Sequence, residues 1–77
     1  MTDKIKPTVR GKDTDFEALS EAGGTLEAQG YTLREAVVVH NPYDNGPVWV
    51  EVWEHTNKQA ATLTCVKRSN KFDVYIT

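Results

Sequence analysis

The stretch Pro47-Val48-Trp49-Val50-Glu51-Val52-Trp53-Glu54-His55 decides the fold of this chain. Its side chains alternate in character, as in a β-strand, because successive residues leave opposite faces of a sheet. One face carries the valines, which are Val48, Val50 and Val52. The other face carries Trp49, Glu51, Trp53 and His55. The valine face is typical of a core, whereas two large aromatics around a charge need either a cover or a binding partner.

The sequence around this stretch predicts an α+β fold. Thr14 and Glu17 have the spacing of a capping box, and Phe16, Leu19, Gly23 and Leu26 follow at helical spacing. We therefore expect one α-helix over about residues 14–29. Alternation with a period of two then predicts strands at about 33–40, 48–55, 60–67 and 72–76. The turns between them favour a four-stranded antiparallel β-meander, with the helix packed on one face.

Two features of the N-terminal half leave alternatives open. Residues 1–12 show no periodicity, so we expect a flexible or extended N-terminal arm there and a single α+β domain over residues 13–77. The Gly23-Gly24 pair stands in the middle of the expected helix, where each glycine costs about 0.8–1.0 kcal/mol relative to alanine. Either the backbone of something else approaches closely at this pair, or the helix breaks into two short pieces there.

The pairing of the hairpins assigns each side chain to a face. Tight turns would pair His55 with Ala60 and Arg68 with Lys71, which places the valines of residues 48–52 in the core with Leu63, Cys65, Val74 and Ile76. Pairing His40 with Val48 extends the opposite, solvent-facing side. That side would collect Val37, Val39, Trp49, Glu51, Trp53, Val66 and Tyr75. An exposed apolar patch of this kind is typical of an interaction site.

Two arrangements would leave no such patch. A one-residue slip in the loop at residues 41–47 would turn Val37 and Val39 inward. Alternatively, the arm could fold back over the tryptophans through Ile5, Pro7 and Val9.

Charge gives a second candidate surface and argues against one class of partner. The net charge of −2 is unlike that of a general nucleic-acid binder, which usually presents a basic face. Five acidic residues follow the arm without an intervening base. They are Asp13, Asp15, Glu17, Glu21 and Glu27. This run is either a solvated helix face or a secondary acidic surface that meets a basic partner.

The sequence gives no reason to expect catalysis. Cys65 lies in the expected core, about 16 Å along the sheet from the end that carries His55, at about 3.3 Å per residue. Glu51 and Glu54 leave opposite faces of one strand, so they cannot act as an acid–base couple. No spacing of histidines, cysteines and carboxylates suggests a metal site. We therefore expect no catalytic residue, no metal and no cofactor.

These observations predict a small non-enzymatic protein–protein interaction module of the inhibitor or adaptor type, such as a virus or mobile element encodes. It would bind another protein, or itself as a homodimer, through the aromatic outer sheet face or the acidic helix. The alternative from another class is a single-stranded nucleic-acid-binding protein that uses Trp49, Trp53 and Tyr75 as a stacking platform. Neither a leader nor a membrane span is expected, which predicts a cytoplasmic protein.

Overall fold

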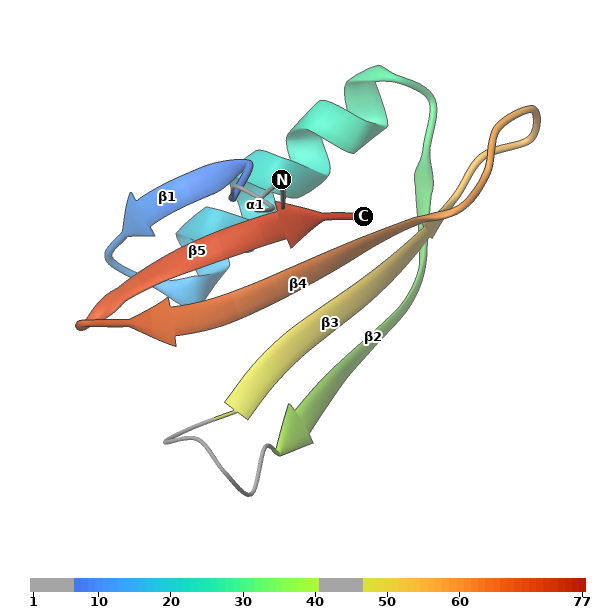
Figure 1. Ribbon diagram of the computed structural model, residues 1–77. Helices are drawn as coiled ribbons and strands as arrows, with labels where there is room; N and C mark the ends of the chain where they lie inside the picture. Colours follow the sequence, from blue (N-terminus) through green and yellow to red (C-terminus); the bar gives the residue numbers. More distant parts are fainter. Residues whose placement is uncertain (1–6, 41–46) are drawn as a thin grey trace, which may run out of the picture.

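A computed structural model describes residues 7–40 and 47–77 of the chain. Within these ranges one helix, α1 (Asp15–Ala28), packs on one face of a five-stranded antiparallel sheet (Figure 1). The strands lie in the spatial order β1-β5-β4-β3-β2. Their bounds are β1 (Val9–Lys12), β2 (Thr32–His40), β3 (Pro47–Glu54), β4 (Ala61–Arg68) and β5 (Lys71–Ile76). The predicted α+β architecture is thus confirmed, and the four predicted strands lie within one residue of their expected bounds.

The number of strands differs from the prediction, because the end of the N-terminal arm is a strand. β1 pairs with β5, and its Val9 lies opposite Val74. Both valines are buried in the core, with 3% and 0% of their surface exposed. The four-stranded expectation is therefore wrong by one strand. The segment Val9–Lys12 shows no periodicity in its sequence, and it forms a strand because it pairs with β5. Ile5 lies outside the described residues.

The helix begins and ends where its local chemistry dictates. Thr14 has an extended backbone, and its hydroxyl accepts a hydrogen bond from the Glu17 N–H at 3.1 Å. At the other end Gly30 has a φ of +92°, which glycine adopts without strain. The N–H of Tyr31 then donates to the Leu26 carbonyl at 3.0 Å. The helix continues unbroken through Gly23-Gly24, and a close approach occurs at Gly23 only. It is made by the side chain of Trp53 and not, as had been expected, by a backbone.

The hairpin between β4 and β5 closes as predicted. Arg68 lies opposite Lys71, and Cys65 lies opposite Val74. The two residues of the turn, Ser69 and Asn70, both have positive φ, of 49° and 67°. This conformation matches the right-handed twist of the flanking strands, which explains the tight two-residue connection.

The register of β3 differs from the prediction by one residue against both of its neighbours. Trp49, not Val50, lies opposite Cys65, and Val39 rather than His40 lies opposite Val48. A shift of one residue moves every side chain of a strand to the other face. Trp49, Glu51 and Trp53 therefore face α1, and the three valines of β3 face away from it. The other predicted strands keep their expected faces.

The core lies between α1 and the β1–β5–β4 half of the sheet. Its fully buried sheet residues are Leu63, Cys65 and Val74. From the helix, Ala18 and Ala22 are fully buried and Leu26 nearly so, so small side chains let α1 approach the sheet closely. Phe16, which was expected on the packed stripe, is 77% exposed. The expectation for Phe16 is wrong because the buried stripe runs along the alanine side of the helix.

Candidate functional site

The face of the sheet that points away from α1 is the candidate site. A row of opposed residues crosses its four long strands, running from Val37 through Val50 and Thr64 to Tyr75. Figure 1 shows α1 on the opposite side of the sheet, and no described element covers this face. Strand alternation adds further apolar residues to the row. We call the set the valine face, and it comprises Val37, Val39, Val48, Val50, Val52, Val66 and Tyr75 with Thr62 and Thr64 between them.

Exposure on the valine face rises toward β2. Val37 and Val39 are 44% and 48% exposed, which is high for aliphatic side chains. The valines of β3, together with Val66 and Tyr75, are partly exposed. The face carries Glu35 on β2 and Asp73 on β5. It is therefore an apolar surface bounded by charges, with its most exposed part at one edge.

The C-terminal hairpin gives this face a basic end. Arg68 projects from the valine-face side of β4, and its guanidinium carbon lies 5.9 Å from the centre of the Tyr75 ring. Asp73 lies on the same hairpin, opposite Val66, and its Oδ1 accepts a hydrogen bond from the Gly11 N–H at 2.9 Å. Tyr75 is the only aromatic side chain on the valine face within the described residues.

The structure brings together four of the seven residues that the sequence assigned to the outer face. Val37, Val39, Val66 and Tyr75 share the valine face, as expected. The other three residues lie on the side of α1, so their predicted place is wrong. They are Trp49, Glu51 and Trp53.

Trp53 is a core residue. Only 6% of its surface is exposed, and its Nε1–H donates to the Glu51 carboxylate at 3.1 Å. Its ring lies against the backbone of Gly23, where a Cβ would come within 2.9 Å of the ring atom Cζ2. The glycine in the helix thus makes room for the indole. The mid-helix glycine pair indicated a close approach, but the sequence does not tell which residue approaches it.

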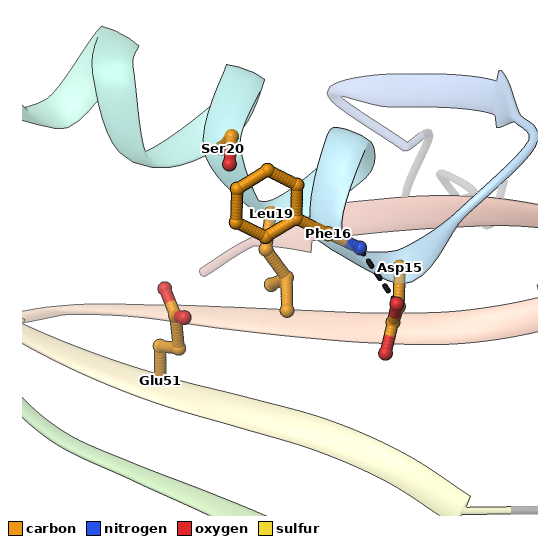
Figure 2. A pocket seen from close by; sticks show the side chains of 5 residues that line it. All are labelled: Asp15, Phe16, Leu19, Ser20 and Glu51. Atoms are coloured by element: carbon orange, nitrogen blue, oxygen red, sulfur yellow. Dashed lines mark hydrogen bonds between the residues drawn. The ribbon is translucent and has the colours of Figure 1, made fainter.

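Trp49 lies at the border of the core. Its ring contacts Phe72 edge to face, with 5.6 Å between the ring centres. An open pocket of about 400 Å³ lies between α1 and β3. Asp15, Phe16, Leu19, Ser20 and Glu51 line this pocket, and Figure 2 shows Glu51 reaching from β3 toward the helix.

The acidic residues do not form one continuous free surface. Lys71 of β5 binds Asp13, and this hydrogen bond holds the pKa of the Asp13 carboxyl below its usual value. Lys12 of β1 binds Glu21 at 2.7 Å, which raises the pKa of the lysine. Two basic side chains from neighbouring strands thus neutralise part of the run. Asp15 also caps the helix locally, since its carboxylate accepts from the Phe16 N–H at 2.7 Å.

The titratable groups considered for catalysis have structural surroundings. Cys65 is fully buried, and burial raises the pKa of its thiol to about 11, with smaller contributions from nearby carboxylates. His55 links two turns, because its Nδ1 accepts from the Asn57 N–H and its Nε2 lies 3.0 Å from the Gln29 carbonyl. Among residues 7–40 and 47–77, no three histidine, cysteine or acidic residues lie close enough to hold a metal ion.

Comparison with known proteins does not add a function. The chain matches no protein-family model, no curated protein and no solved structure. In the part of the chain that the structure describes, α1 is too short and too polar to cross a bilayer. The candidate site therefore stands on the geometry of the valine face alone.

Proposed function

We propose that this protein is a small protein-binding module of the inhibitor or adaptor type, and that it binds its partner through the valine face. One observation carries the proposal: a sheet face with seven apolar side chains has no cover within the described residues. Soluble proteins rarely expose contiguous apolar patches of this extent unless the patch meets a partner. The strand β3 makes the face more apolar than the sequence predicted, since it contributes three valines in place of Glu51 and two tryptophans.

The chemistry of the face defines the complementary partner. Its centre would contact an apolar surface, and Glu35, Asp73 and Arg68 at its border would fix the orientation of that surface. A sheet face is also rigid, because each strand is hydrogen-bonded to its neighbours. Binding would then cost little conformational entropy in this chain.

Single-stranded nucleic acid has less support as a ligand than the sequence suggested. Stacking of bases needs several exposed aromatic rings, and the expected platform loses Trp49 and Trp53 to the helix side. Tyr75 remains, with Arg68 beside it. Two carboxylates on the same face would repel phosphates. We therefore propose a protein partner.

Thr64→Lys tests the proposal. Thr64 lies in the central row of the valine face and is partly exposed, so a lysine can stand there in the unbound protein while opposing burial under a partner. We expect Thr64→Lys to weaken binding of the partner at least about tenfold, which corresponds to about 1.4 kcal/mol. The measurement is affinity capture from the native host with mass spectrometry, followed by titration of the captured protein.

Thr25→Lys is the matched control, because it makes the same substitution at an exposed position of α1 on the other side of the sheet. We expect the wild type and Thr25→Lys to capture the same protein. Loss of binding in Thr25→Lys alone would assign the interaction to the acidic helix and contradict the proposal. Tighter binding of a single-stranded oligonucleotide by Thr64→Lys, without loss of a protein, would favour the nucleic-acid function instead.

A further inference from the structure

β2 presents an open edge of unusual character for a soluble protein. It forms the outer edge of the sheet over nine residues, and every side chain from Thr32 to Val39 is exposed. Its middle is apolar on both sides: Val37 and Val39 belong to the valine face, while Ala36 and Val38 face the side of α1. A long, exposed, apolar edge strand is a template for pairing with another strand.

The features that protect edge strands are missing from the middle of β2. The irregularity in its pairing with β3 is confined to Leu33–Glu35, and the register is regular from Glu35 to His40. The described part of the strand contains no proline and no lysine. Its two charged residues, Arg34 and Glu35, stand next to each other toward one end.

The opposite edge of the sheet is protected. β1 is only four residues long, its register against β5 shifts between Val9 and Lys12, and it carries the basic residues Arg10 and Lys12. Short length, irregular pairing and positive charge all oppose pairing at an edge. Among the described residues, only the β2 edge is therefore available to a further strand, and an assembly built through β2 would stop at two copies.

We propose that two copies of this chain pair through β2, antiparallel and centred on Val37, to form one continuous ten-stranded sheet. An antiparallel pair with this centre sets Val37 opposite its own copy and Ala36 opposite Val38 of the second copy. The proposed dimer does not rest on the proposed protein-binding function, because it forms through the backbone edge of β2 and not through the valine face.

The charges of β2 do not oppose a second copy as the occupant. The described residues of β2 carry one positive and one negative charge, so two copies of the edge do not repel each other as a whole. In the antiparallel arrangement Glu35 lies opposite Val39 of the second copy. The two Glu35 residues are then four residues apart along the strand, or about 14 Å at about 3.4 Å per residue. This distance exceeds the Debye length of about 8 Å at physiological ionic strength, which largely screens their repulsion.

Pairing would change the surface that the molecule offers. The two-fold axis that relates the two copies stands perpendicular to the sheet. Both helices therefore lie on one side of the ten-stranded sheet, and both valine faces lie on the other. The most exposed part of each valine face, at Val37 and Val39, meets its counterpart at the junction. The dimer therefore presents one apolar surface across both copies, and its partner would meet a symmetric platform.

Charged substitutions at Val38 test the pairing, because Val38 is 62% exposed and lies off the valine face. Light scattering should give twice the chain mass of 8.6 kDa for the wild type. Val38→Lys and Val38→Glu should each be monomers, since like charges would meet about 7–8 Å apart on a diagonal across the junction. An equimolar mixture of the two variants should again give a dimer, because opposite charges then meet.

Val38→Thr is the matched control, since it keeps the branched shape without a charge, and it should remain dimeric. Circular dichroism checks that each variant is folded. Three results would each overturn the proposal. They are a wild type that stays monomeric at millimolar concentration, a dimeric Val38→Lys, and an equimolar mixture of Val38→Lys and Val38→Glu that stays monomeric. Thr64→Lys should remain dimeric, so failure of the valine-face proposal and failure of this one are distinguishable.

Discussion

At the scale of single residues, Gly23 and Trp53 decide which face of β3 packs against the helix. An indole ring needs a flat, close surface, and Gly23 provides it because it lacks a Cβ, which would come within 2.9 Å of the ring atom Cζ2. Any side chain at position 23 would enter the space of the ring. Gly24, its neighbour, has no atoms near the position of a Cβ. Two adjacent glycines with the same cost to the helix thus have different roles.

Alanine substitutions should separate these roles. Gly24→Ala should raise the free energy of unfolding by about 0.8–1.0 kcal/mol, since alanine favours the helix and meets nothing. In Gly23→Ala the same gain is opposed by overpacking against the rigid indole, which costs about 1–3 kcal/mol. We therefore expect Gly23→Ala to be less stable than Gly24→Ala by about 1–3 kcal/mol in urea unfolding. Equal stabilisation by both substitutions would show that Trp53 does not press on the helix.

At the scale of elements, the helix could be predicted from its caps and the strand β3 could not be placed by its turns. The hydroxyl of Thr14 and the glycine at position 30 act on groups within a few residues, so the sequence alone contains their effect. The register of β3 depends on six residues between β3 and β4 that do not form a tight turn. A loop of this length permits either register, and packing selects between them.

Thr14→Ala should destabilise the protein by about 1 kcal/mol, because it leaves the Glu17 N–H without its side-chain acceptor. Thr14→Ser keeps the hydroxyl and should retain most of the stability. The measurement is the urea midpoint followed by far-ultraviolet circular dichroism. Identical midpoints for the wild type and Thr14→Ala would mean that the cap contributes nothing.

At the scale of the whole molecule, Cys65 reports on the integrity of the single core. It is fully buried on the central strand β4, and burial holds the pKa of its thiol at about 11. The reactive thiolate is therefore scarce in the native state at pH 8, and reagents have no access. We expect a thiol reagent to label Cys65 only through global unfolding, at a rate that rises with urea. Fast labelling without denaturant would indicate that the core opens locally.

The same thiol predicts how stability depends on pH. Its pKa in the folded state, about 11, lies above the reference value of 9.0. The unfolded chain thus loses its proton first, and the contribution of Cys65 to stability is complete below pH 9 and lost as pH rises toward 11. Cys65→Ala is the control, since other groups also titrate in this range. Between pH 9 and pH 11, the free energy of unfolding should fall more for the wild type than for Cys65→Ala. An equal fall in the two proteins would contradict this account.

By itself the sequence determined what local interactions and periodicity control. These are the α+β class, the helix and its caps, four strands to within one residue, and the tight hairpin between β4 and β5. It also placed Val37, Val39, Val66 and Tyr75 on one open face. For Val37 and Val39 this placement is correct because the two one-residue register errors, on either side of β3, cancel.

Only the tertiary structure decided the face of β3 and the fifth strand. A one-residue register shift leaves the alternation of a strand intact while reversing its faces, so the periodicity of residues 47–55 fits both choices. The fit of Trp53 against Gly23 and the burial of Val9 beside β5 connect residues about 30 and 65 positions apart in the chain. Such contacts exist only once the chain has folded, and they turned the valines of β3 outward onto the candidate site.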